Sequence, residues 1–77
     1  MSISNKAFKG AVNENLRQAL ATDCYDTANH RWWSIAGIQD VALAAGESTL
    51  FEYATDAMDK VAAHIKTLPI VCRGKAA

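Results

Sequence analysis

The side chains of this sequence best suited to holding a metal ion are those of two cysteines and two histidines: Cys24, His30, His64 and Cys72. Thiolate and imidazole groups are ligands that zinc prefers. A structural zinc site, however, normally takes its ligands in close pairs separated by about two to four residues. No two of these four residues are that close. The spacing therefore predicts no metal site, and we expect no cofactor.

A disulfide between Cys24 and Cys72 would close a long loop and stabilise the fold by about 4 kcal/mol on the chain-entropy model. Each cysteine follows the end of a predicted helix. We place these two ends at opposite poles of an up-down-up bundle, which disfavours the bond. In a reducing compartment the thiols would also stay unpaired. Two reduced, partly buried thiols are the expected state.

The groupings that carry out catalysis are missing from the sequence. A nucleophile beside a base, a clustered carboxylate pair or a glycine-rich phosphate loop would indicate an enzyme. Asp23 with Asp26, and Asp56 with Asp59, are close in sequence, but they fall where helix starts and solvated faces favour carboxylates. A bundle of this size also leaves little room for a ligand-sized pocket. We therefore expect a protein that is not an enzyme.

The most informative cluster is His30-Arg31-Trp32-Trp33. Adjacent residues of a helix point about 100° apart, so Trp32 and Trp33 cannot enter the same narrow core stripe. One indole is expected to anchor the core, and the other, beside Arg31, has the composition of a binding hot spot. The alternative is that both indoles lie along a groove between helices. We assign His30, Arg31 and Trp33 to a partner-binding surface.

The composition indicates one small helical domain spanning residues 1–77. Hydrophobic residues make up 51% of the chain and charged residues 21%, which is too apolar for a disordered protein. Abundant alanine and a single proline favour packed helices over a sheet. A domain of this size has a thin core and is usually reinforced by cross-links, a metal ion or oligomerisation.

Charge and hydropathy limit the kinds of partner and the cellular compartment that we expect for this protein. Eight basic and eight acidic residues cancel, so no net field directs the protein to nucleic acid or to an anionic membrane. Nucleic-acid binding is thereby disfavoured and is kept as the alternative. The sequence begins without the apolar run of a secretory signal, and its longest near-apolar stretch, 41–46, is too short to cross a bilayer. We expect a cytoplasmic protein with no membrane association.

Hydrophobic periodicity predicts an all-α, three-helix bundle with helices at about 4–21, 26–45 and 49–67. The middle helix is apolar nearly all round, which indicates that neighbours cover it on more than one side. Gly46 has the position of a C-terminal glycine cap, and Thr49 with Glu52 fits a capping box that opens the third helix. Pro69 ends that helix, and residues 70–77 are expected to form a flexible tail.

The third helix carries an apolar seam at the three-and-four spacing of a close-packed helix pair. Its residues include Phe51, Met58, Val61 and Ile65. Together with the middle helix, this seam offers more apolar surface than three short helices can cover mutually, and monomers rarely leave such surface exposed. We therefore expect a homodimer that completes a larger bundle, with these four residues at the self-association interface. The alternative is that they form the monomer's core.

Residues 38–46, Ile-Gln-Asp-Val-Ala-Leu-Ala-Ala-Gly, resemble the first half of a helix-turn-helix unit, with a small alanine four residues before the turn glycine. Residues 49–53 are similar to the start of the recognition helix in TetR-like repressors. Over 38–60 the resemblance implies a DNA-binding regulator. The acidic side chains of its second part would face phosphates with the wrong sign, so DNA binding is the alternative function.

Residues 31–36, Arg-Trp-Trp-Ser-Ile-Ala, are similar to a short motif in small phage helical-hairpin proteins that sequester cyclic nucleotide signals. This resemblance implies a protein that removes a small-molecule signal, and it assigns no ligand residues. Signal sequestration is the remote alternative.

We expect a regulatory protein that binds another protein and acts by occluding or tethering it. Short chains without net charge or a cofactor are often encoded by phages or mobile elements as inhibitors of host proteins, and we expect that mode of action. A DNA-binding protein would be distinguished by an affinity for duplex DNA that depends on the salt concentration. A protein that sequesters a nucleotide signal would be thermally stabilised by the nucleotide.

Overall fold

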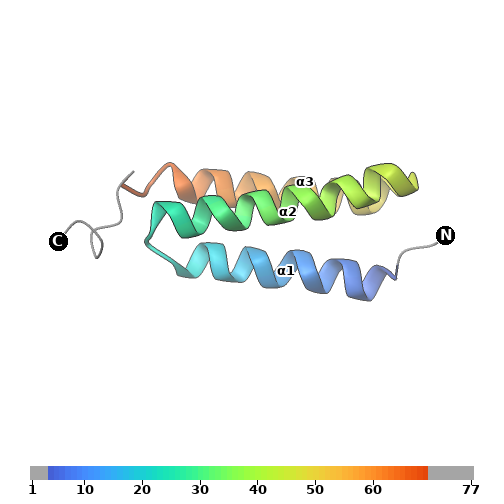
Figure 1. Ribbon diagram of the computed structural model, residues 1–77, viewed down its shortest axis with the longest axis horizontal. Helices are drawn as coiled ribbons and strands as arrows, with labels where there is room; N and C mark the ends of the chain where they lie inside the picture. Colours follow the sequence, from blue (N-terminus) through green and yellow to red (C-terminus); the bar gives the residue numbers. More distant parts are fainter. Residues whose placement is uncertain (1–3, 70–77) are drawn as a thin grey trace.

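The computed structural model describes residues 4–69, which form three α-helices. They are α1 (Asn5–Ala21), α2 (Tyr25–Ala45) and α3 (Ser48–Ile65). The helices lie side by side and alternate in direction, so that α1 and α3 run the same way and α2 runs against both (Figure 1). No strand occurs within residues 4–69. The predicted all-α, three-helix architecture is therefore confirmed, whereas the predicted tail at 70–77 lies outside the described residues.

Helix α1 begins and helix α2 ends at residues suited to capping. The Ser4 hydroxyl accepts a hydrogen bond from the Ala7 N–H at 3.3 Å. At the end of α2, Gly46 takes the left-handed conformation with φ 71°, which costs glycine little. Its N–H donates to the Leu43 carbonyl at 3.1 Å, and the Glu47 N–H donates to the Ala42 carbonyl at 2.9 Å. The predicted glycine cap is therefore confirmed.

The start of α3 differs from the prediction. The helix begins at Ser48, its N-cap is Glu47, and no side chain caps it. Thr49 therefore lies inside the first turn and does not act as the N-cap, so the predicted capping box is wrong. The physical reason is the short turn: once Gly46 has reversed the chain, only Glu47 separates the two helices.

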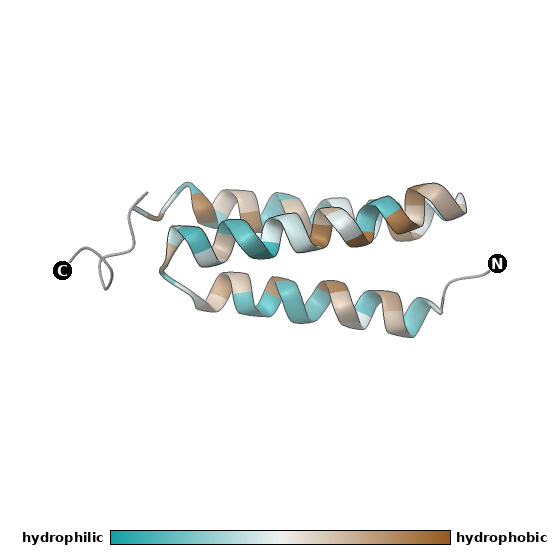
Figure 2. Cartoon of the chain, viewed as in Figure 1, coloured by the Kyte–Doolittle hydropathy of each residue, from teal (hydrophilic) through white to brown (hydrophobic). Residues whose placement is uncertain are grey.

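The core lies along the line where the three helices meet. Its buried residues are Phe8, Val12, Ala19, Ala28, Ile35, Ala42, Leu50, Ala54, Ala57, Met58 and Val61. Two of the three residues that α2 buries are alanines, whose small side chains let neighbouring helices approach closely. Figure 2 shows that apolar residues gather in the half of α2 that leads into the turn, while its first half is largely hydrophilic.

The expected self-association seam on α3 packs largely within the monomer. Val61 is fully buried and Met58 is buried as well. Phe51 and Ile65 are half-buried and pack against the same core. The two buried residues have almost no surface to offer a second copy, because α1 and α2 already cover them. This favours the alternative assignment of Met58 and Val61 to the core, while the self-association of the chain stays a prediction.

The ends of α1 and α3 meet at the same pole of the bundle, and the expectation that they lie at opposite poles is wrong. His64 Nε2 lies 2.8 Å from the carbonyl oxygen of Thr22, the residue that ends α1. An up-down-up order returns the third helix to the direction of the first, which places their ends together (Figure 1).

Cys24, which precedes α2 at this pole, is disulfide-bonded, so the expected reduced thiol at this position is wrong. Cys72 lies outside the described residues. Disulfides are typical of oxidising compartments, so the cytoplasmic location stays a prediction. Within residues 4–69, none of the helices is long and apolar enough to cross a membrane.

Candidate interaction surface on helix α2

Large apolar side chains are exposed mainly on α2. Among the described residues, Trp33 and Leu43 are each 63% exposed and Val41 is 54% exposed, and all three belong to α2. The remaining one, Leu20 on α1, is 45% exposed. Single exposed apolar residues are common on any protein, but several on one helix indicate a surface that a partner covers.

The two tryptophans of the expected binding cluster have different environments. Trp32 is partly buried and packs against the core, whereas Trp33 is exposed. Their ring centroids are 4.9 Å apart with an interplanar angle of 85°, an edge-to-face contact. This is the favoured geometry of an aromatic pair. The core therefore holds Trp32, and Trp32 in turn steadies the exposed indole of Trp33.

Trp33 belongs to a side of α2 that faces away from the core. Because successive helical residues turn by about 100°, Trp33 and Val41 lie about 40° to either side of Gly37. The buried residues Ile35 and Ala42 lie on the opposite side of the helix. We call this exposed side the outer face of α2; it consists of Trp33, Gly37, Asp40, Val41 and Ala44.

Gly37 lies at the centre of the outer face. A Cβ atom added to it would meet no atom within 4 Å, so nothing in the monomer requires glycine there. Glycine in the middle of an exposed helix is unfavourable by about 1 kcal/mol relative to alanine. A close approach of another backbone is the usual physical reason for keeping it.

His30 and Arg31 differ in their position relative to the outer face: His30 lies about 20° around α2 from Gly37, one turn before Trp33, whereas Arg31 lies about 120° away. His30 is exposed, whereas Arg31 is half-buried and donates from Nη1 to Asn15 Oδ1 of α1 at 3.2 Å. Both line a shallow hollow at the start of α2, together with Asp26 and Thr27. The structure thus brings His30 and Arg31 together around this hollow, and it ties the guanidinium to α1 and not to the indole of Trp33.

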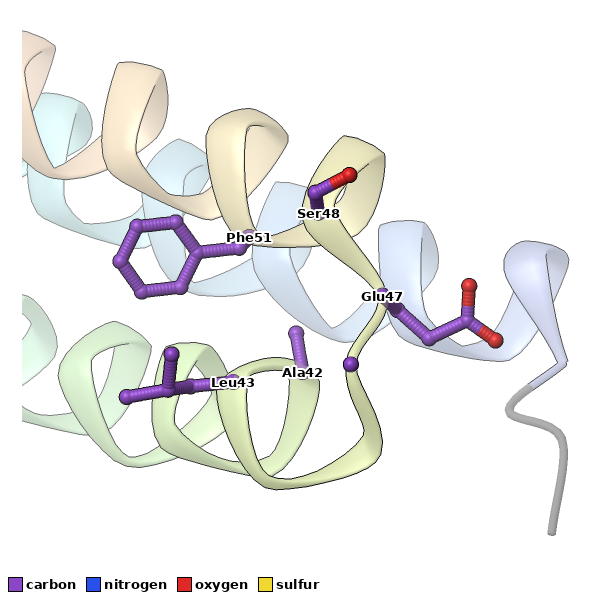
Figure 3. Close-up of a pocket in the computed structure, with 6 residues that line it drawn as sticks. Ala42, Leu43, Glu47, Ser48 and Phe51 are labelled. Carbon is purple, nitrogen blue, oxygen red and sulfur yellow. The ribbon is translucent and has the colours of Figure 1, made fainter.

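A second apolar hollow lies beside the turn between α2 and α3 (Figure 3). It is lined by Ala42, Leu43, Gly46, Glu47, Ser48 and Phe51, has a volume of about 170 Å³ and is open to solvent. The Phe51 ring and the Leu43 side chain flank it, and the Glu47 carboxylate points away from the ring (Figure 3). Leu43 lies about 120° around α2 from Gly37, so this hollow is separate from the outer face.

The expectation from sequence missed Gly37, Asp40, Val41 and Ala44 as members of the surface around Trp33. The signal that could have found them is the spacing of four between positions 33, 37 and 41, followed by 44. Such a spacing marks one helical face. It was hidden because apolar residues occur on nearly every side of α2, and only burial distinguishes the covered side from the free one.

The segment 38–60 does not have the shape of a helix-turn-helix unit. In that unit the two helices cross at about 90–120° and are joined by a turn of three to four residues. Here α2 and α3 pack side by side in opposite directions, and only 46–47 separates them (Figure 1). The segment is an antiparallel helical hairpin, so it presents no recognition helix at an angle to its neighbour.

Electrostatic features of the described part of the chain are concentrated on α1. Arg17 Nη2 lies 2.5 Å from Glu14 Oε2, and Gln18 Nε2 donates to the same oxygen at 2.6 Å. These hydrogen bonds lower the pKa of Glu14 from 4.5 to about 2, and the same ion pair raises the pKa of Arg17. Residues 4–69 contain no group of three or more metal-binding side chains.

Comparison with known proteins adds no relative: no family model, no curated protein and no solved structure matches the chain.

Proposed function

We propose that this protein is a non-enzymatic interaction protein that binds another protein chain through the outer face of α2. The observation that carries the proposal is the exposure of Trp33, which is 63% exposed although its ring is held against Trp32. Binding would regulate the partner by occlusion or tethering.

Three properties of the outer face support this proposal. Tryptophan is enriched at binding hot spots because it offers a large contact area. A ring already steadied by a neighbour loses little conformational freedom on binding, which favours affinity. The small residues Gly37 and Ala44 beside Trp33 would let a partner approach the helix backbone. Arg31, by contrast, is engaged with Asn15, so we assign it a supporting role and keep Trp33 as the anchor.

A matched pair of variants tests the proposal. Trp33→Ala removes the exposed indole, and Leu43→Ala removes an equally exposed apolar side chain that lies off the outer face. Partners captured by the immobilised protein from an extract of its host would be identified and purified, and their affinities measured by titration. We expect Trp33→Ala to weaken binding at least tenfold and Leu43→Ala to leave it unchanged. Equal affinity of both variants would contradict the proposal.

A further inference from the structure

We propose that the chain covering the outer face of α2 is a second copy of this protein, packed with its own α2 antiparallel and with a twofold axis beside Gly37. This inference rests on the proposed function and specifies its partner. Trp33 of each copy would insert among Gly37, Asp40, Val41 and Ala44 of the other copy.

The spacing along α2 fits such a pair. Positions 33 and 41 are equally far from 37, so an antiparallel crossing centred on Gly37 brings Trp33 of one copy level with Val41 of the other. In packed helices, a protruding side chain enters a hole formed by four residues of the facing helix. Residues 37, 40, 41 and 44 form such a hole. The twofold axis makes the same contact twice, as a symmetric dimer requires.

The sizes of the residues fit as well. A hole that receives an indole needs small residues at its base, and Gly37 and Ala44 supply them. No atom of the monomer lies within 4 Å of a Cβ built on Gly37, so the space above the glycine is open to the second helix. This arrangement gives a physical reason for a glycine that otherwise only weakens the exposed middle of α2.

The polar groups on the face are complementary. Within residues 4–69, neither the indole N–H of Trp33 nor the carboxylate of Asp40 makes a hydrogen bond. In the proposed pair, Asp40 borders the hole that Trp33 enters, and its carboxylate is placed to accept the indole N–H. A buried tryptophan usually requires such a partner. With eight basic and eight acidic residues, the two copies have no net charge to repel one another.

The extent of the face predicts a weak dimer. Only one side of one helix takes part, and a fully buried tryptophan contributes about 150–250 Å². The total then falls below the roughly 1,200 Å² of a standard stable interface. We therefore expect a monomer–dimer equilibrium that depends on concentration.

Sedimentation equilibrium over a hundredfold dilution tests the dimer. The full chain is compared with Trp33→Ala, with Leu43→Ala as its control, and circular dichroism checks that each variant is folded. We expect Trp33→Ala to weaken the dimer at least tenfold, while Leu43→Ala matches the parent. A dimer that Trp33→Ala leaves unchanged would overturn the inference, as would a parent that stays monomeric at millimolar concentration.

Alanine variants of two glycines test the position of the twofold axis. Gly37→Ala adds a methyl group from each copy at the crossing point and should weaken the dimer about tenfold, which is typical of overpacking. Gly10→Ala adds the same methyl group at an exposed position of α1 with equally open surroundings and should not change association. Equal dimer affinity of these two variants would contradict a crossing at residue 37.

A cysteine variant gives a second readout, because a disulfide traps the dimer covalently even where the added side chain weakens it. Gly37→Cys places one thiol from each copy at the twofold axis, and mild oxidation should cross-link the dimer through position 37. Thr49→Cys, at an exposed position of α3, is the control and should remain uncross-linked. Cross-linking at Thr49→Cys alone would refute the arrangement. If the parent is monomeric but Trp33→Ala weakens its binding to a different protein, this inference fails while the proposed function stands.

Discussion

His64 on α3 and Thr22 at the end of α1 are joined by a hydrogen bond of 2.8 Å between the imidazole Nε2 and the backbone carbonyl. The two residues are 42 positions apart in sequence. Because a carbonyl only accepts, the imidazole must carry its proton on Nε2 in this contact. The bond ties the last turn of α3 to the chain that leaves α1, and it fixes the pole at which Cys24 also lies.

We expect His64→Ala to destabilise the fold by about 1 kcal/mol, because the Thr22 carbonyl then loses its partner in a partly buried place. For a domain of this size, the melting temperature should fall by about 4–8 °C. Thermal unfolding followed by circular dichroism measures the shift. His30→Ala, at an exposed position, is the control and should melt close to the parent. Equal shifts in the two variants would show that the hydrogen bond does not stabilise the protein.

The same substitution at two glycines should have opposite effects. Gly46→Ala forces a residue with a Cβ into the left-handed conformation at φ 71°, and it should destabilise the fold by about 1 kcal/mol. Gly10→Ala replaces a glycine inside α1 with open surroundings and should stabilise the fold by about 0.4–1 kcal/mol. Urea unfolding of both variants checks the signs. A gain in stability for Gly46→Ala would contradict the assigned cap.

Alanine substitutions at two valines should distinguish the core from the outer face of α2 by their effect on stability. Val61 is fully buried, whereas Val41 is 54% exposed. Val61→Ala should cost about 2 kcal/mol in the free energy of unfolding, because it removes buried methyl groups and leaves a cavity. Val41→Ala should change it by less than about 0.5 kcal/mol in the monomer. Unfolding at low protein concentration is the measurement. A small effect at Val61 would restore it as a candidate for self-association.

The Glu14–Arg17 pair predicts a pH dependence with a definite sign. The pKa of Glu14 is about 2 in the folded protein against 4.5 ordinarily. A lowered carboxyl pKa stabilises the fold above pH 4.5, and that stabilisation disappears as the pH falls toward 2. The stability difference between the parent and Arg17→Gln should therefore be constant at neutral pH and vanish near pH 2. An NMR titration should place the Glu14 midpoint near 2 in the parent and closer to 4.5 in Arg17→Gln.

Sequence reasoning predicted the elements of this fold well because they depend on local patterns. The apolar residues Phe8, Val12, Leu16, Ala19 and Leu20 recur at helical spacing on α1; Phe8, Val12 and Ala19 are buried, whereas Leu16 is partly buried and Leu20 is 45% exposed. Gly46 ended α2 as predicted, since a left-handed cap leaves a recognisable glycine. The capping box at Thr49 failed because the pattern also occurs inside a first turn, and only the length of the preceding turn decides which residue is the N-cap.

The candidate interaction surface was harder to predict because it depends on which face of each helix its neighbours cover. The sequence distinguished Trp32 from Trp33 only as one buried and one exposed, and the bundle assigned those roles. Periodicity alone could not tell whether the seam containing Met58 and Val61 faced its own chain or a second copy, since the same spacing serves both. The three-dimensional arrangement placed these two residues inside the monomer and left the outer face of α2 uncovered.

The short links at 22–24 and 46–47 have a consequence for folding kinetics. Each link joins helices that pack against each other, so many tertiary contacts form between segments close in sequence. Helical bundles with such low contact order fold in microseconds to milliseconds. The long-range contacts between α1 and α3, such as the hydrogen bond from Tyr53 to Asn13, close larger loops. We expect them to be completed last, after the helices joined by each short link have packed against each other.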